Sequence, residues 1–557
     1  MGGPMRLGVN ARAPGGAEGV AKASPRDRRR RHPARRAPAE GPPRAPPGEG
    51  GGGAWAAPPP PGPAPLVAVS TPALDAWRVE VGALTPPPRC EHVGTCAGCA
   101  LADPDAVPPV AAEAAAFFAA QGVTPLEVRL GAPTGWRRRA KLAVRADPGT
   151  GLLTLGLFMR DSHTIVPIVP ACLMHHPAIN EAAARVQDEA RALGVAAYEE
   201  GGAGAPWSLR YVQLTVDEAS STVQVGLVVH ARRMAPPATS TDPGGGVEER
   251  GGGGRAAALA LGERLDSAGH DVWFNFNDKD TNTIFGPRWE PLGSGGVPAV
   301  SAPRVWDALG NGVTVPLAPG AFAQANGEMV RELVETMADE VGKLEGVTGK
   351  VLELYAGSGG LGLSLASRLG LRCRCIELNA ESHDAFGLAR STLLTSPAFN
   401  AARNPAGASA VAQSGHVVAD AGDPQVLREE LWGGTAEGDV VLVDPPRKGL
   451  HPATLDALCR VAGHKPAGGA GGAGGRGDGA SPAKARGPSA LVYVSCGYDA
   501  FKRDLAALRA ARWRIQHVSA YRFFPGANHL ELLAVLSRPG RPPAVTRGPQ
   551  ADDDGLD

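Results

Sequence analysis

Several features are scarce or missing in this chain, and each absence narrows its class. The 557 residues contain no apolar run of the roughly 18 residues that a membrane-spanning helix needs, so we expect no membrane span. Eight cysteines in so long a chain do not make a secreted disulfide framework. The formal net charge is zero, so any RNA-binding surface must come from local clusters of Arg and Lys.

Glycine and proline are abundant, with 75 and 52 residues, well above average use. They concentrate in low-complexity stretches at 1–65, 236–255 and 466–488. Such stretches cannot bury enough apolar surface to order themselves, so we interpret the two internal ones as surface insertions. The terminal segment 541–557 is predicted to be a disordered tail. The chain length favours two or three domains.

The amino-terminal segment 1–65 is basic. Its first 50 residues contain eleven Arg or Lys and four acidic residues, which resembles an organellar transit peptide. A disordered basic arm, or an extended start in a gene of biased composition, explains the pattern equally well. The leader favours a plastid or mitochondrion, and without targeting we expect a cytoplasmic protein.

The patterned part of the chain divides into two predicted domains. Residues 66–300 are predicted to form a β-rich central domain, and residues 301–540 alternate strand and helix. The second pattern predicts an α/β fold with a doubly wound, mostly parallel, Rossmann-like sheet. The clearest predicted strands are 141–145, 153–158, 211–216 and 223–229 in the first domain, and 351–354, 373–376, 440–443 and 491–494 in the second.

A glycine-rich turn follows the first strand of the second domain. Gly357 and Gly359 lie in this turn, and the next strand ends at Glu377. A glycine turn lets the backbone approach a ligand, and a carboxylate at that distance can accept hydrogen bonds from both ribose hydroxyls. The spacing is not that of G-x-G-x-x-G, which favours S-adenosylmethionine over NAD. Asp420 follows a third strand and faces the adenine or serves as a turn aspartate.

Two further strand ends carry reactive groups. Asp444 precedes two prolines that fix the chain at the carboxyl edge of the sheet, where such folds bind ligands. Cys496 ends the last parallel strand and is predicted to be exposed at the rim of the cleft, unlike Cys373, Cys375 and Cys459, which we interpret as structural.

Glu531 opens an apolar strand 35 residues after Cys496 and is a candidate general base. Together these groups suit methylation of uracil at carbon 5. A thiolate that adds to carbon 6 raises electron density on carbon 5, and a base must later remove the carbon-5 proton.

Four other cysteines have spacings typical of metal ligands. Cys90, Cys96 and Cys99 are close in sequence, and Cys172 is distant. Three clustered thiols and a remote fourth favour an iron–sulfur cluster. Zinc held by four thiolates is the alternative. The spacing differs from that of radical adenosylmethionine enzymes.

In these motifs the chain resembles the RNA uracil-C5 methyltransferases, particularly the iron–sulfur branch that modifies 23S ribosomal RNA. The resemblance covers about residues 88–538 and includes Phe322-Ala-Gln324-Ala-Asn326, similar to the family's F-x-Q-x-N. It implies a class I methyltransferase domain beside a central domain that holds a [4Fe-4S] cluster. It implies these roles: cofactor contacts at Gln324, Tyr355, Gly357, Gly359, Glu377, Asp420 and Asp444, the nucleophile Cys496, the base Glu531, and cluster ligands Cys90, Cys96, Cys99 and Cys172.

The chain departs from the family in a few places. Gly497 and Tyr498 stand where the family often has Asn-Pro, Gly360 stands where many members have Asn or Thr, and no RNA-binding β-barrel is evident before Cys90. RNA contacts are therefore expected in the central domain, at Arg137, Arg138, Arg139 and Lys141, acting on phosphates. Their alternative interpretation is a solvated basic strand edge.

The resemblance favours ribosomal RNA as the substrate and a monomeric enzyme. Three alternatives remain: a transfer RNA uridine-C5 methyltransferase, a non-catalytic RNA-binding or assembly factor with the same fold, and a cytosine-C5 methyltransferase. The last is disfavoured because its nucleophile is expected after Pro, and here it follows Ser495.

Overall fold

The computed structural model describes most of the chain beyond residue 90 and one short strand before it. The described residues are 66–69, 90–104, 106–200, 205–230, 252–279, 281, 283–292, 304–397, 399, 403–461 and 487–538. The predicted basic leader, the predicted tail and most of both predicted insertions lie outside these ranges. Within the described residues, no helix has the length and apolarity needed to cross a bilayer.

The larger sheet has nine strands. Its order is β1 (Leu66–Val69), β2 (Leu126–Leu130), β17 (Arg514–Arg522), β18 (Glu531–Ser537), β16 (Ala490–Ser495), β15 (Val440–Val443), β12 (Val351–Leu354), β13 (Cys373–Glu377) and β14 (Gly415–Val418). Strands β14, β13, β12, β15 and β16 run parallel, whereas β18 is antiparallel to both β16 and β17. The predicted alternation of strand and helix is confirmed.

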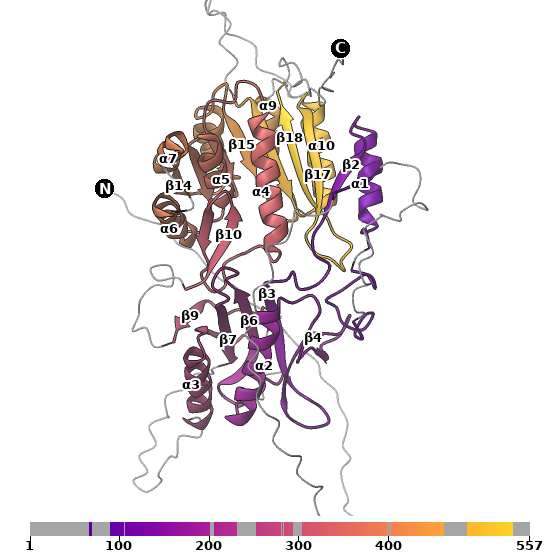
Figure 1. Ribbon diagram of the computed structural model, residues 1–557, viewed down its shortest axis with the longest axis vertical. Coiled ribbons are helices and arrows are strands. Elements are labelled where there is room, and N and C mark those ends of the chain that lie inside the picture. Colours follow the sequence, from indigo (N-terminus) through magenta and orange to yellow (C-terminus); the bar gives the residue numbers. More distant parts are fainter. Residues whose placement is uncertain are drawn as a thin grey trace, which may run out of the picture. The chain divides into compact units, whose positions relative to one another are not determined.

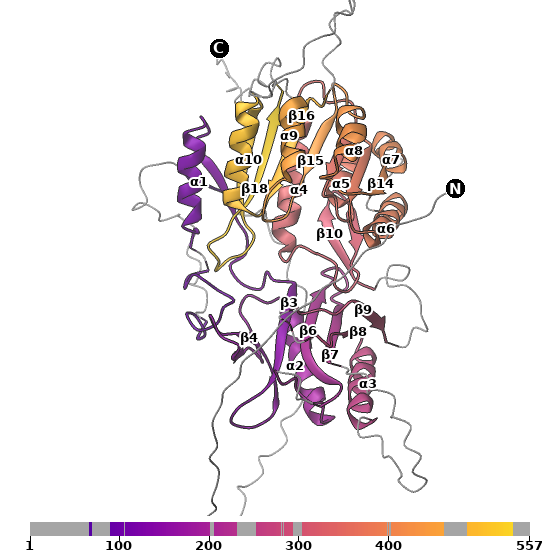
Figure 2. The ribbon, with the colours of Figure 1, turned by 180° about the vertical axis from the view of Figure 1, so that it is seen from behind.

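Helices cover both faces of this sheet (Figures 1 and 2). One face packs against α1 (Val110–Ala119), the short α8 (Pro424–Val426) with the π-helical turn η2 (Leu427–Trp432), α9 (Pro452–Val461) and α10 (Tyr498–Ala510). The other packs against α4 (Gly327–Gly342), α5 (Gly360–Leu369), α6 (Glu381–Thr395) and α7 (Pro405–Ala412). The central strands are consequently buried on both sides, which explains their nearly continuous apolar sequences.

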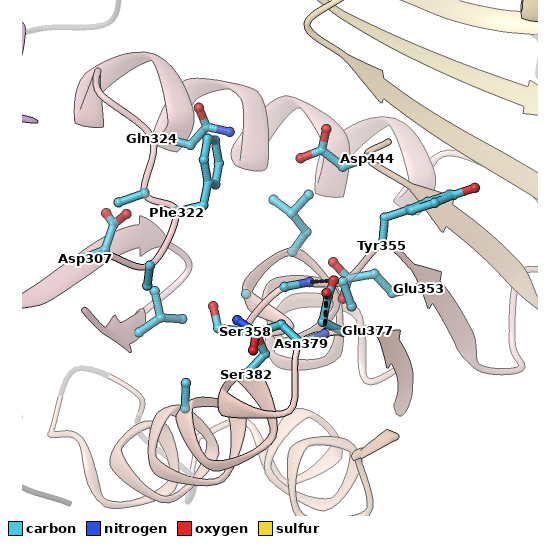
Figure 3. A pocket seen from close by; sticks show the side chains of 18 of the residues that line it. Asp307, Phe322, Gln324, Glu353, Tyr355, Ser358, Glu377, Asn379, Ser382 and Asp444 are labelled. Carbon is cyan, nitrogen blue, oxygen red and sulfur yellow. Dashed lines mark hydrogen bonds between the residues drawn. The ribbon is translucent and has the colours of Figure 1, made fainter. Parts of the chain in front are cut away.

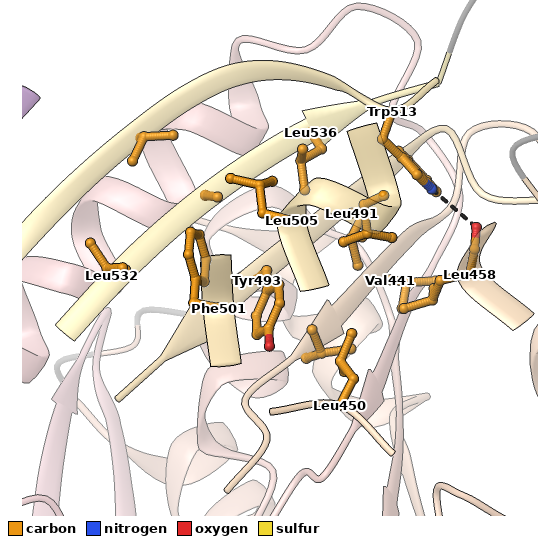
Figure 4. Packing of buried hydrophobic residues seen from close by; sticks show 14 of the residues in the cluster. Val441, Leu450, Leu458, Leu491, Tyr493, Phe501, Leu505, Trp513, Leu532 and Leu536 are labelled. Carbon is orange, nitrogen blue, oxygen red and sulfur yellow. Dashed lines mark hydrogen bonds between the residues drawn. The ribbon is translucent and has the colours of Figure 1, made fainter. Parts of the chain in front are cut away.

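The core under α9 and α10 is built on large side chains (Figure 4). The aromatic rings of Tyr493 and Phe501 lie 5.0 Å apart, and both are fully buried. The indole nitrogen of Trp513 donates a hydrogen bond of 3.0 Å to the Leu458 carbonyl, so its polar atom is satisfied. This packing fixes the position of α10, which begins directly after Cys496 and Gly497.

The predicted central domain, residues 66–300, differs from the structure at its amino-terminal part. The segment containing β1, α1 and β2 belongs to the larger sheet, because β2 pairs in parallel with β17. Its alternating burial, with Leu126, Val128 and Leu130 inward, suits a strand with one buried face in either sheet. Periodicity alone therefore could not assign it to its partner.

The central sheet has seven strands, in the order β5 (Ile165–Pro167), β4 (Leu153–Phe158), β3 (Arg139–Ala146), β6 (Ser208–Val216), β7 (Val223–His230), β8 (Asp271–Phe276) and β9 (Arg288–Pro291). Helices α2 (Pro177–Ala192) and α3 (Gly252–Ser267) cover one face. All pairs are antiparallel except β7 with β8, which α3 connects. The predicted strands are confirmed, but residues 252–255, predicted to lie in an insertion, begin α3.

A two-stranded hairpin precedes α4 and packs against helices of the larger sheet. It consists of β10 (Trp306–Gly310) and β11 (Val313–Pro316). Leu309 of β10 contacts the start of α5, where a Cβ added to Gly360 would lie 2.1 Å from the leucine Cδ1. The hairpin thus forms one wall beside the glycine-rich turn.

Candidate active site

The parallel strands place the predicted functional residues along one edge of the sheet. Tyr355, Glu377, Asp444 and Cys496 each stand at or just after the carboxyl end of a strand, and these ends lie together because the strands are parallel. Glu531 comes from the opposite direction. It begins β18, which is antiparallel to β16, so the start of β18 lies beside the end of β16.

A pocket of about 750 Å³ opens at this edge (Figure 3). The predicted residues that line it are Gln324, Tyr355, Gly357, Glu377, Asp420, Asp444, Cys496 and Glu531. Gly359 does not line it: a Cβ there would lie 2.5 Å from the Phe386 ring, so this glycine serves packing behind the turn. The volume lies within the range of about 300–1,000 Å³ typical of small-molecule sites.

The glycine turn and Glu377 are hydrogen-bonded to each other. One carboxylate oxygen of Glu377 accepts from the Gly357 N–H at 3.0 Å, and the other accepts from the Asn379 N–H at 2.9 Å. Each oxygen keeps acceptor capacity for a ligand hydroxyl. His416 holds the turn from behind, since its Nε2 lies 3.0 Å from the Gly357 carbonyl oxygen.

The opposite wall comes from the segment before α4. Asn326 caps α4 by accepting from the Met329 N–H at 3.2 Å, and its amide donates to the Phe523 carbonyl at 3.1 Å. Two residues earlier, Gln324 borders the pocket, and Phe322 is 81% exposed. The F-x-Q-x-N motif therefore connects the wall of the pocket to the strand that leads toward Glu531.

Two predicted cofactor contacts also make structural hydrogen bonds. The Asp420 carboxylate accepts from the Gly422 N–H at 2.7 Å, so the turn role considered for this residue is present along with its place in the pocket wall. The Tyr355 hydroxyl accepts from the His451 N–H and bonds the Thr454 hydroxyl, both at 3.1 Å. Both partners lie outside the pocket lining, so these bonds hold the phenol end of Tyr355 away from the cavity.

Burial and like charges perturb the acidic groups around Cys496. The pKa of the Cys496 thiol is raised to about 11 by burial and then by Glu531 and Asp444, whereas Arg447 lowers it. Burial, assisted by Asp444, raises the pKa of Glu531 well above its usual value. Burial raises the pKa of Asp444 to about 7. A thiol, two carboxyls and one guanidinium thus interact in one cleft, which is typical of proton-transfer sites.

Close contacts with His529 and Arg447 hold the loop formed by Cys496 and Gly497. The His529 Nε2–H donates to the Cys496 carbonyl at 2.6 Å. A Cβ on Gly497 would lie 2.4 Å from the Arg447 carbonyl oxygen, so this departure from the family pattern lets two loops pack closely. Buried Asp504 accepts from the Leu450 N–H at 2.8 Å and from the Tyr493 hydroxyl at 2.7 Å, which anchors the loop after Asp444.

The four predicted cluster ligands converge. The pKa of the Cys99 thiol is raised to about 11, first by burial and then by Cys172, Cys96 and Cys90. The Gly98 N–H also donates to the Cys96 sulfur at 3.3 Å. However, no three His, Cys, Asp or Glu side chains among the described residues are placed to hold a metal ion. The predicted iron–sulfur site is therefore not confirmed.

Several pocket residues were not among the predicted contacts. Asp307 and Glu353 line the cavity, as do Asn379 and Ser382 beyond Glu377. Burial raises the pKa of Glu353 to about 8, and its carboxylate accepts from the Gly362 N–H at 3.0 Å. Glu353 is an acidic residue inside an otherwise apolar strand. This pattern could have indicated a functional carboxyl group from the sequence alone.

One predicted phosphate contact has a different role. Arg138 is 2% exposed and forms ion pairs with Asp307 and with Glu218, the latter at 3.5 Å. Its Nε also donates to the Gln324 carbonyl at 3.2 Å. Arg138 is therefore an internal link between the central sheet and the pocket wall, and it is not available to RNA.

These features define a class. A doubly wound parallel sheet with a glycine turn and a carboxylate at the end of its second strand is a nucleotide-binding α/β domain. A cysteine and two carboxyl groups, Cys496, Asp444 and Glu531, line the same pocket.

Comparison with known proteins identifies the family. The chain is 30% identical over 450 residues to an uncharacterised RNA methyltransferase of Protochlamydia amoebophila, covering 81% of this chain and 97% of that protein. The chain therefore belongs to this family of RNA methyltransferases, in agreement with the resemblance of its motifs. An uncharacterised RNA methyltransferase of Lactobacillus johnsonii is 24% identical, with coverage of 73% and 72%.

The chain was also compared with solved structures and with protein-family models. A Pyrococcus abyssi tRNA (uracil-54, C5)-methyltransferase, solved with S-adenosyl-L-homocysteine, is 21% identical and has a TM-score of 0.47. The alignment covers 74% of this chain and 79% of that one. No protein-family model matches the chain.

Proposed function

We propose that this protein is an S-adenosylmethionine-dependent RNA (uracil-5-)-methyltransferase that forms 5-methyluridine. The observation that carries the proposal is that Cys496 and Glu531 border the same pocket as the glycine turn and Glu377. Membership in a family of RNA methyltransferases supports RNA as the substrate. The cysteine and the glutamate favour carbon 5 of a pyrimidine as the acceptor, because this weakly nucleophilic carbon needs both groups. Uracil is favoured over cytosine because the nucleophile follows Ser495.

The pocket fits adenosylmethionine by the chemistry of its donors. Glu377 has acceptor capacity for two ribose hydroxyls, and the Gly357 turn offers a close backbone surface. Gln324 and Asp444 border the space between this turn and Cys496. When bound, adenosylmethionine supplies an electrophilic methyl group.

The residues of this chain carry the remaining steps. The Cys496 thiolate adds to carbon 6 of the uracil, and the resulting enolate makes carbon 5 nucleophilic. After carbon 5 has gained the methyl group, Glu531 accepts the carbon-5 proton, the double bond re-forms and the thiolate leaves. Because the resting thiol has a pKa of about 11, it must first lose a proton. Glu531 and Asp444 are the carboxylates that interact with it, and Arg447 favours the thiolate.

Ribosomal RNA is the proposed substrate, as the resemblance to the iron–sulfur branch implies, and the enzyme is proposed to act as a monomer in a plastid or mitochondrion. The target uridine must leave its stack to reach Cys496, as bases do in other enzymes that modify them.

The four converging cysteines are proposed as ligands of a [4Fe-4S] cluster. Four thiols without a disulfide partner, and the guanidinium of Arg137 beside Cys99 and Cys172, support this assignment. No three of these thiols are placed to bind a single metal ion within the described residues, whereas a [4Fe-4S] cluster takes each thiolate on a different iron. The mechanism above has no step that depends on the cluster. Iron and acid-labile sulfide in anaerobically purified protein, lost in Cys99→Ser, would test the assignment, and bound zinc would replace it.

The test of the main proposal is a methyl-transfer assay with radiolabelled adenosylmethionine and either organellar or bacterial ribosomal and transfer RNA. We expect label in 5-methyluridine of ribosomal RNA. The label should be lost in Cys496→Ala and kept in Cys459→Ala, the matched control, because Cys459 lies on α9 outside the pocket. Label in transfer RNA alone would change the substrate. Bound adenosylmethionine without transfer to either RNA would refute the enzyme and leave an RNA-binding factor.

A further inference from the structure

The central sheet has a second face with its own small cluster of side chains. Helices α2 and α3 pack on the first face. The second cluster contains Ala143, Tyr211 and Val228, joined by Phe158 and Ile284, and no helix of the described part of the chain contributes to it. A pocket of about 400 Å³ opens here, and we call it the Arg145 pocket. Its volume suits a small molecule or one nucleotide.

Two guanidinium groups and two tyrosine rings form the body of the Arg145 pocket. Arg210 lies 4.6 Å from the centroid of the Tyr198 ring, and Arg145 lies 5.3 Å from it. Both arginines also lie 5.8 Å from the centroid of the Tyr211 ring. Planar cations among aromatic rings are the surfaces on which proteins stack unpaired bases.

The polar atoms of the Arg145 pocket point to a ligand with acceptors and donors. Arg210 is 4% exposed and donates to the carbonyls of Lys279, at 2.6 Å, and Thr281, yet its Nε has no partner among the described residues. The Nε of Arg145 is likewise unsatisfied, while its amino group bonds Glu200 at 3.0 Å. A carboxylate and two cations together can read the edge of a base and hold a phosphate.

A row of basic residues on β3 leads from the active-site side to this pocket. Arg139, Lys141 and Arg145 are separated by even numbers of residues along β3, with Ala143 between the last two, so they share one face of the sheet. Neither Arg139 nor Lys141 has an ion pair within the described residues, and the Lys141 ammonium lies over the Phe285 ring at 4.6 Å. Neighbouring Arg138 reaches Asp307 in the wall of the large pocket. The row spans about 20 Å, at about 3.3 Å per residue.

We propose that the Arg145 pocket binds a second unpaired nucleotide of the RNA substrate, while the target uridine occupies the site of Cys496. The base stacks against Tyr198 and Tyr211, Arg145 and Arg210 contact its phosphate or edge, and Arg139 with Lys141 follows the phosphates between the two sites. This inference rests on the proposed action on RNA. It adds a recognition site that requires the substrate to display two unstacked nucleotides separated by a fixed span.

The first test compares substrate binding in variants of the Arg145 pocket. Arg145→Gln and Tyr198→Leu should raise KM for RNA about tenfold, or about 1.4 kcal/mol, while kcat and adenosylmethionine affinity stay unchanged. The matched control is Arg264→Gln on the helix-covered face, where Arg264 is half exposed and pairs with Glu189 at 2.6 Å. Equal KM values for all three variants and the parent would overturn the inference, and so would a loss of kcat alone.

The second test does not depend on turnover. RNA carrying 4-thiouridine is irradiated with the Cys496→Ala protein, and cross-linked peptides are identified by mass spectrometry. We expect cross-links to the peptides that contain Tyr198 or Tyr211, weakened in Arg145→Gln. If no RNA is methylated but these cross-links form, the proposed function fails and the pocket stands. If methylation proceeds and RNA cross-links only elsewhere, the inference fails and the proposed function stands. The same holds if the pocket binds free uridine monophosphate but not the RNA.

Discussion

The substitution Glu531→Gln separates the two halves of the proposed reaction. Glu531 is 3% exposed, and its carboxyl interacts with Cys496, Asp444 and Arg447. Glutamine keeps the size and one acceptor oxygen but cannot take the carbon-5 proton. Addition of Cys496 and methyl transfer precede proton removal, so the variant should stop after methylation with the RNA still attached to the cysteine.

The magnitude follows from the role of the base and from the charges around it. A positioned general base contributes about 10²–10⁴-fold to a rate, so multiple turnover should fall by that factor. Because Glu531 raises the pKa of Cys496 from within the cleft, its removal should also lower that pKa below about 11. The pH profile of iodoacetamide alkylation of Cys496 should then shift toward lower pH.

Three readouts test this reasoning together. Denaturing gels should show a protein–RNA adduct that carries label from adenosylmethionine, turnover should collapse, and alkylation should become faster at neutral pH. Turnover within tenfold of the parent would show that Glu531 is not the base. Loss of turnover without an adduct, in a variant that still binds adenosylmethionine and RNA, would refute the order of steps.

Three further outcomes are expected. Arg447→Gln removes the group that lowers the Cys496 pKa, so the pH profile of alkylation should shift to higher pH. The thiolate fraction and the alkylation rate rise with pH up to that pKa. An unshifted profile would contradict this charge effect. Glu377→Ala should weaken adenosylmethionine binding roughly 10- to 150-fold by calorimetry, since a hydrogen bond to a charged group contributes about 1.5–3 kcal/mol, while RNA affinity stays constant. Phe501→Ala should destabilise the fold by about 3–5 kcal/mol in denaturant unfolding, because the ring is fully buried between Tyr493 and Phe118; a change under 1 kcal/mol would contradict the described core.

Local sequence was enough for the elements of the parallel sheet. The predicted strands at 351–354 and 440–443 match β12 and β15 to the residue. These segments are buried on both faces, so their sequences are apolar apart from Glu353 and are bounded by polar residues. The placement of β2 could not be predicted this way, because a strand with alternating burial fits either sheet until its partners β1 and β17 are known.

The features of the candidate site also divide into those that the sequence determined and those that depend on the tertiary structure. The sequence by itself determined which chemical groups follow each strand, and parallel topology then required Glu377, Asp444 and Cys496 to share one edge. Only the tertiary structure decided that Gly359 serves packing, that Arg138 is buried in ion pairs, and that Arg145 and Tyr198 share a pocket. The reason is physical: the type and bounds of an element follow from local periodicity, whereas strand pairing, burial and side-chain contacts depend on residues from distant parts of the chain.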